Sequence, residues 1–127
     1  MLSCRSILYV AFATLASACG GSAYHQGQAS GELATRLFFT NESLDQAAIY
    51  VARTGLRPMR IGTVMPGRTE TIVVPSALVN GGGTINVYAR PLGRDDGPDS
   101  GPLTLSPGEA LSVRLPMNQR MLIVLPP

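Results

Sequence analysis

The sequence of 127 residues contains only two cysteines, and both lie near its beginning, at Cys4 and Cys19. The residues after Cys19 therefore offer no thiol for a disulfide, a zinc site or a nucleophile. The same absence excludes the Cys-x-x-Cys motif of redox proteins. A domain built from these residues has to be stabilised by its apolar core alone.

Lysine is absent, and the single histidine is His25. A serine nucleophile needs a neighbouring base, and neither histidine nor lysine occurs after residue 25. The glycine run at residues 81–83 is not followed by the lysine of a phosphate-binding loop. The sequence thus predicts a protein that is not an enzyme, with no catalytic residue, no metal and no cofactor. A lone histidine among small and polar residues, as at His25, is usually a solvated side chain.

Charge is sparse and nearly balanced, with ten arginines against eight acidic residues and a formal net charge of +2. The arginines are spread singly along the chain, whereas nucleic-acid binding needs basic side chains gathered on one face. We therefore expect no nucleic-acid partner. The carboxylates are mostly isolated too, so a small carbohydrate-active hydrolase is an alternative that no obvious carboxylate pair supports. The isolated carboxylates are Glu32, Glu42, Asp45, Glu70 and Glu109.

The beginning of the chain has the layout of a bacterial secretory signal. Arg5 precedes an uncharged, mostly apolar run at residues 7–16, which is too short for a helix that spans a bilayer, because such a helix needs about 20 residues. The run ends in Leu-Ala-Ser-Ala-Cys-Gly-Gly, with the cysteine at position 19. This stretch resembles the signal of bacterial lipoproteins.

The lipoprotein resemblance implies cleavage before Cys19, a lipid on its thiol and attachment of the chain to a membrane. Gly20 follows the cysteine, which resembles the signal for the outer membrane rather than for retention at the inner membrane. The alternative is a secreted or periplasmic protein, because residues 16–18 also form an Ala-x-Ala site for ordinary signal peptidase.

Composition divides the chain into three parts. Residues 1–18 are the predicted signal peptide, and residues 19–34 are the lipidated cysteine with a flexible linker of small and polar residues. Such a linker has a root-mean-square reach of about 20 Å. Residues 35–127 are long enough for one domain.

Short apolar runs separated by glycine, proline and asparagine fill the third part. Alternation is clear at residues 84–90, where Ile85, Val87 and Ala89 share one face, and where Asn86, Tyr88 and Arg90 share the other. We predict an all-β fold, a small antiparallel β-sandwich of about seven or eight short strands. The strands expected are residues 36–40, 47–53, 59–64, 69–74, 84–90, 103–105, 110–115 and 120–125, with at most one helical turn at 76–79.

Residues 64–75 align without gaps on residues 105–116, and the matching positions include a Pro-Gly pair and a final proline. Proline followed by glycine occupies the centre of a type II turn, because glycine tolerates the positive φ of the second position. Each copy therefore predicts a turn that leads into a strand. This pattern resembles immunoglobulin-like and fibronectin-type-III-like sandwiches of exported bacterial proteins. The resemblance implies a fold and leaves the function open.

The longest interval between confident strands is residues 91–102, which we expect to be a loop that contacts a partner through Arg94, Asp95, Asp96 and Asp99. The alternative is a tolerated insertion with no partner. Calcium bound by the three aspartates is a further alternative, but their spacing does not fit the twelve-residue calcium-binding loop, and a solvated turn suffices to explain them. We expect a membrane-anchored envelope lipoprotein that serves as a non-enzymatic binding or structural module. Its partners would be the membrane, through the lipid on Cys19, and an envelope protein or glycan. An accessory subunit of an outer-membrane assembly or transport complex is the alternative.

Overall fold

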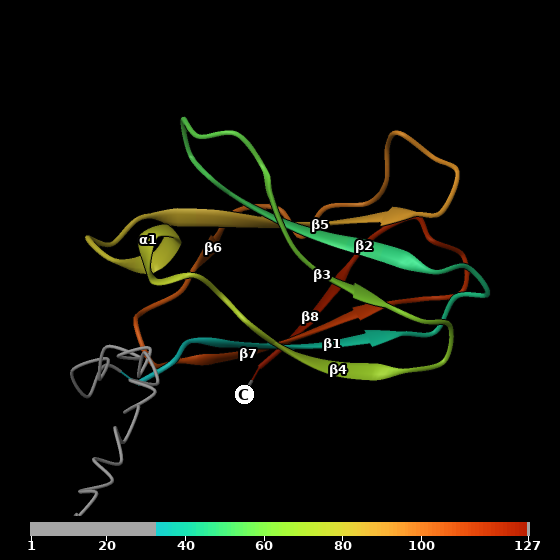
Figure 1. The fold of residues 1–127 in the computed structure, drawn as a ribbon, viewed down its shortest axis with the longest axis horizontal. Helices are drawn as coiled ribbons and strands as arrows, with labels where there is room; N and C mark the ends of the chain where they lie inside the picture. Colours follow the sequence, from blue (N-terminus) through green and yellow to red (C-terminus); the bar gives the residue numbers. More distant parts are fainter. Residues whose placement is uncertain (1–32, 127) are drawn as a thin grey trace, which may run out of the picture.

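The computed structural model describes residues 33–126, which form two four-stranded β-sheets packed face to face (Figure 1). The first sheet has the order β4 (Thr69–Val73), β1 (Arg36–Asn41), β7 (Ala110–Leu115), β8 (Ile123–Leu125). The second has the order β3 (Met59–Val64), β2 (Ala47–Arg53), β5 (Thr84–Pro91), β6 (Leu103–Thr104). One helical turn, α1 (Ser76–Val79), follows β4. The predicted all-β sandwich is confirmed.

The observed strand bounds agree with the predicted ones to within one residue, except at the last strand, and the direction of one strand pair also differs. The last strand starts at Ile123 rather than at residue 120, because a turn at Gln119, with φ +52°, precedes it. Five of the six strand pairs in residues 33–126 are antiparallel, but β1 and β7 run parallel. All four strands of the second sheet lie between β1 and β7 in the sequence, so no hairpin fixes the relative direction of these two strands.

The core lies between the sheets and consists of the inward-facing residues of both. The alternation predicted for β5 is confirmed, since Ile85, Val87 and Ala89 are at most 1% exposed. Burial of one such aliphatic side chain contributes about 1.5–3 kcal/mol, and this term is the main source of stability. The largest buried side chains from the other strands are Leu37, Phe39, Ile49, Val51, Val64, Val113 and Leu115.

Both predicted Pro-Gly turns are present. The amide of Arg68 donates to the carbonyl of Met65 (3.2 Å), and the amide of Glu109 donates to that of Ser106 (3.1 Å). Gly67 and Gly108 have φ values of +67° and +83°, as the second position of a type II turn requires. The strands that the two turns lead into, β4 and β7, lie on opposite sides of β1.

The register places four connections at one end of the sandwich, which we call the loop end (right in Figure 1). The loop-end connections are residues 42–46, 65–68, 92–96 and 116–122. The opposite, N-terminal end holds α1 and the first described residues, because Arg36 is paired with the last residue of β4 and the first of β7. Among the described residues, no helix has the length and hydropathy to cross a membrane.

Candidate functional site

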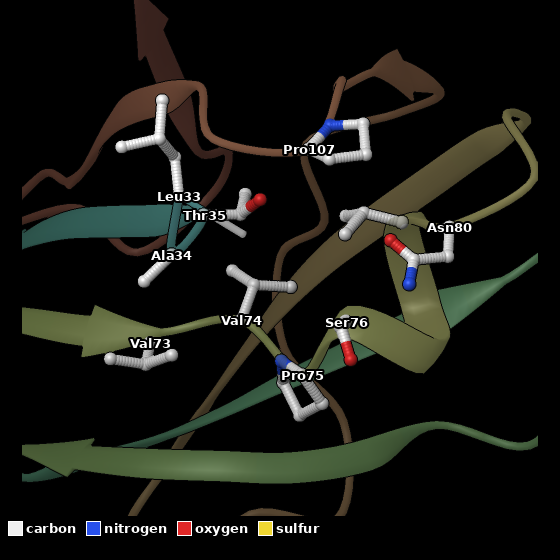
Figure 2. Close-up of a pocket in the computed structure, with 10 residues that line it drawn as sticks. Leu33, Ala34, Thr35, Val73, Val74, Pro75, Ser76, Asn80 and Pro107 are labelled. Carbon is white, nitrogen blue, oxygen red and sulfur yellow. The ribbon is translucent and has the colours of Figure 1, made fainter. Parts of the chain in front are cut away.

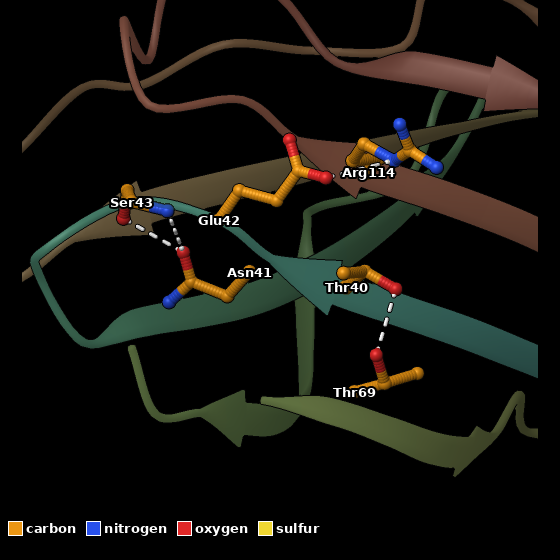
Figure 3. Close-up of polar contacts among 6 residues, drawn as sticks. All are labelled: Thr40, Asn41, Glu42, Ser43, Thr69 and Arg114. Atoms are coloured by element: carbon orange, nitrogen blue, oxygen red, sulfur yellow. Dashed lines mark hydrogen bonds and ion pairs between the residues drawn. The ribbon is translucent and has the colours of Figure 1, made fainter. Parts of the chain in front are cut away.

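Asn41, at the end of β1, organises the loop end. Its side chain is fully buried, and its amide nitrogen donates to the carbonyls of Asp45 (2.8 Å) and Val64 (3.1 Å). Its carbonyl oxygen accepts hydrogen bonds from the amide (3.0 Å) and the hydroxyl (2.7 Å) of Ser43 (Figure 3). One side chain thereby fixes the turn at 42–46 and joins it to the end of β3.

The other three loops are each hydrogen-bonded to this segment. The amide of Leu92 donates to the carbonyl of Gln46 (2.7 Å), and the amide of Gly67 donates to that of Asn41 (2.7 Å). The side-chain amide of Gln119 donates to the carboxylate of Asp45 (2.9 Å). The loop end is therefore a connected surface held in place by hydrogen bonds rather than four independent loops.

Large apolar side chains project from all four of these loops. Their exposed fractions are 79% for Leu44, 73% for Leu92, 68% for Met117, 61% for Met121 and 54% for Met65. Single exposed apolar residues are common, but a group of them at one end of a domain indicates an interaction surface. We call these five residues the apolar tips.

A hollow of about 260 Å³ adjoins the apolar tips on the outer face of the second sheet. Tyr50 on β2 forms its floor, and the guanidinium carbon of Arg90 lies 4.6 Å from the centre of the Tyr50 ring. Arg60 is the partner of Tyr50 on β3. We call this site the arginine hollow, and its lining is Gln46, Ala48, Tyr50, Arg60, Arg90, Pro91, Leu92, Gly93, Arg94 and Asp95.

The structure divides the four residues predicted as a loop contact. Arg94 and Asp95 line the arginine hollow, and Asp96 is exposed beside them. Asp99 forms a bridge with Tyr88 on β5, and its carboxylate accepts a hydrogen bond from the amide of Gly101 (3.0 Å). Only the first part of the predicted contact therefore belongs to the site.

Residues 97–100 extend the second sheet and are not part of a free loop. The amide of Ala89 donates to the carbonyl of Pro98 (3.0 Å), and the amide of Ser100 donates to that of Val87 (2.9 Å). A β-carbon at Gly97 would collide with the carbonyl oxygen of Ala89, so the backbone approaches β5 as closely as only glycine allows. The interval predicted as one loop is a short projection at 92–96 followed by a paired segment.

The carboxylates of the described residues do not gather into a metal site. In residues 33–126, no three Asp, Glu, His or Cys side chains are placed to hold a metal ion together, and the aspartates at 95, 96 and 99 form no such group. Glu42 pairs with Arg114 at 3.2 Å (Figure 3), and Glu109 accepts a hydrogen bond from the amide of Ser106 (2.8 Å).

A second hollow, of about 220 Å³ and largely apolar, lies at the N-terminal end (Figure 2). Leu33 and Ala34, predicted as the last residues of the linker, line it together with Val73, Val74 and Pro107. Leu33 also lies directly against the turn at Gly108. The first described residues thus pack on the domain.

Cys19 and the rest of the predicted signal and linker up to residue 32 lie outside the described residues. In comparisons with protein-family models, curated proteins and solved structures, no match to the chain is found. The lipoprotein signal and the resemblance to immunoglobulin-like domains therefore stay predictions.

Sequence reasoning missed the apolar tips and the part played by Tyr50 and Arg60. A partial signal was present, since alternation in β5 placed Tyr88 and Arg90 on the outward face. The same alternation in β2 puts Tyr50 outward, but only the structure shows that Tyr50 is paired with Arg60 and lies under the guanidinium of Arg90.

Proposed function

We propose that this chain is a lipoprotein anchored to the bacterial outer membrane through Cys19, and that its β-sandwich is a non-enzymatic module that binds another envelope protein at the loop end. The apolar tips carry this proposal. They occupy the end of the domain opposite Leu33, where the chain from the anchor would arrive. An anchored domain so arranged can direct its tips away from its own attachment point.

The chemistry of the loop end favours a protein partner over a lipid surface. The loops that carry the apolar tips hold four carboxylates and three guanidinium groups, so they lack the excess of positive charge that attracts anionic headgroups. These charged residues are Glu42, Asp45, Asp95 and Asp96, with Arg68, Arg94 and Arg120. Methionine and leucine side chains adapt their shape to an apolar partner surface. Because the loops are already held by hydrogen bonds, ordering them on binding costs little conformational entropy.

Capture from the native envelope tests the docking proposal. Full-length wild-type protein and the control variant Leu56→Ser should both retrieve the same partner after crosslinking. Leu56 is an exposed apolar residue (57%) in the loop that joins β2 and β3, at the N-terminal end. Leu44→Ser and Met117→Ser should lose that partner. Equal capture by all four proteins would refute docking at the loop end. The identity of the partner distinguishes a binding module from a subunit of an assembly.

The anchor has a separate test. A fatty-acid label should be incorporated into the wild type and not into Cys19→Ser. Unlabelled wild-type protein released into the medium would instead establish the secreted alternative.

A further inference from the structure

The arginine hollow carries excess positive charge. Three guanidinium groups, of Arg60, Arg90 and Arg94, share it with one carboxylate, that of Asp95, which leaves a formal charge of +2. Within residues 33–126, none of these three arginines takes part in an ion pair. Arg53, by contrast, is engaged with the carbonyls of Asn80 (3.1 Å) and Gly82 (2.8 Å). The hollow therefore has the electrostatics of a site for an anion.

The strands preorganise two of the three arginines, Arg90 on β5 and Arg60 on β3. The guanidinium of Arg90 is held over the ring of Tyr50 by a cation–π contact, and the residue opposite Arg90 on β2 is the small Ala48, which leaves space above the sheet. Arg60 is steadied by a hydrogen bond from its guanidinium to the hydroxyl of Thr63. A planar guanidinium fixed in this way matches the two oxygens of a carboxylate.

The remaining groups of the hollow select among anions. The carboxylate of Asp95 accepts hydrogen bonds and cannot donate them, so it favours a ligand that carries hydroxyl groups beside its anionic group. The side-chain amide of Gln46 both donates and accepts. Leu92, which is 73% exposed, offers apolar contact to C–H groups. Together these residues fit a ligand that carries a carboxylate, several hydroxyls and an apolar ring face.

We propose that the arginine hollow binds an acidic saccharide, through a sugar unit that bears a carboxylate. Arg90 and Arg94 bind the carboxylate, while Asp95 and Gln46 bind ring hydroxyls. This activity requires neither the lipid on Cys19 nor a protein docked on the apolar tips, so the two proposals can fail independently.

Titration of the full-length protein with a galacturonic acid trimer tests the proposal. Calorimetry should show saturable binding that weakens as salt is added, because the charges are solvent-accessible. Arg90→Gln and Arg94→Gln should each weaken binding about tenfold or more, as expected when a charge-assisted hydrogen bond is lost. Asp95→Asn keeps one hydrogen-bonding oxygen and removes a negative charge that faces the anionic ligand, so it should change the affinity for the trimer less than either arginine change does.

Controls separate this ligand from other anions. Arg36→Gln removes one charge from the outer face of the other sheet and should leave affinity unchanged. The methyl ester of the trimer should not bind. The proposal would be overturned if the ester, poly-glutamate or inorganic phosphate bound as tightly as the trimer. It would also be overturned if the trimer did not bind, or if Arg36→Gln lost as much affinity as the two variants of the hollow. Arg94 lies in an exposed projection, so Arg94→Gln should retain the fold, and a loss of binding in this variant is not explained by unfolding.

Discussion

Asn41 shows how much a single polar residue contributes to the shape of the loop end. Its side chain makes four hydrogen bonds while being fully buried, so every polar atom of the amide is satisfied. A polar side chain in this position stabilises one conformation of the turn, because any other conformation would leave buried groups without partners. The apolar tip at Leu44 is presented by this turn.

Replacement of Asn41 by alanine should destabilise the domain by about 3 kcal/mol, because it leaves the carbonyls of Asp45 and Val64 and the hydroxyl of Ser43 without this partner. Urea unfolding measures the change. Thr40→Val is the matched control, because it removes an exposed hydrogen bond to Thr69 (2.9 Å) and should cost less than about 1 kcal/mol. Equal effects would mean that the buried network is not important for stability.

The two Pro-Gly turns offer a second comparison between single residues. Gly67 and Gly108 both have positive φ, so valine is strained at either position and should cost about 1 kcal/mol or more. Nothing lies within 4 Å of a β-carbon built at Gly67, but one at Gly108 would approach the β-carbon of Leu33 to 2.8 Å. Gly108→Val should therefore lower the urea midpoint more than Gly67→Val does. The reverse order would contradict the packing of Leu33 on this turn.

At the scale of elements, the sequence predicted what local chemistry controls. Both type II turns, the single helical turn at 76–79 and the bounds of most strands follow from proline, glycine and alternation. The parallel pairing of β1 with β7 does not, because it joins residues more than 70 positions apart and depends on how both sheets close around one core. The pairing of residues 97–100 with β5 was not predicted, because the segment begins with glycine and proline, which are typical of loops.

The same reasoning explains how much of the candidate site was predictable. Arg94 and Asp95 were identified because they stand out in an interval of polar residues. Tyr50 and Arg60 were not, because their importance comes from the register of β2 with β3 and of β2 with β5. The apolar tips were missed for a similar reason: each is an isolated residue until four turns are brought to one end.

Residues 91–102 contain an exposed projection and a segment paired with β5, so changes in these two parts should affect stability differently. Replacing residues 93–96 with a short Gly-Ser turn should leave the thermal midpoint within a few degrees, because a change in loop length has a small effect on closure entropy. Gly97→Ala should destabilise the domain by about 2 kcal/mol, since its β-carbon would collide with the carbonyl of Ala89 on β5. Differential scanning calorimetry measures both, and a silent Gly97→Ala would show that the segment does not pair with β5.

For the molecule as a whole, the two ends of the sandwich have different surroundings. The N-terminal end is where the first described residues are packed, with Thr35 only 3% exposed. The loop end carries the apolar tips, and the arginine hollow lies next to them through Leu92. If a protein docks on the tips while a saccharide occupies the hollow, the two contacts act as a bivalent attachment and their combined strength exceeds either alone.

The boundary of the domain can be tested with two fragments, one that includes Thr35 and one that lacks it. The carbonyl of Thr35 accepts a hydrogen bond from the amide of Val74 (2.9 Å), and its hydroxyl accepts one from the amide of Gly108 (2.9 Å). A chain of residues 33–127 should therefore unfold in one cooperative transition, whereas residues 36–127 should melt roughly 5–10 °C lower, because two backbone amides lose their partners. Identical midpoints for the two fragments would place the beginning of the domain at β1, with Thr35 outside the cooperative unit.

Chelator and reductant should leave the midpoint of residues 33–127 unchanged, because this segment contains no cysteine and its carboxylates do not gather around a common point. Calorimetry with and without EDTA and dithiothreitol makes the comparison. A midpoint that falls with EDTA would restore the metal alternative at Asp95, Asp96 and Asp99.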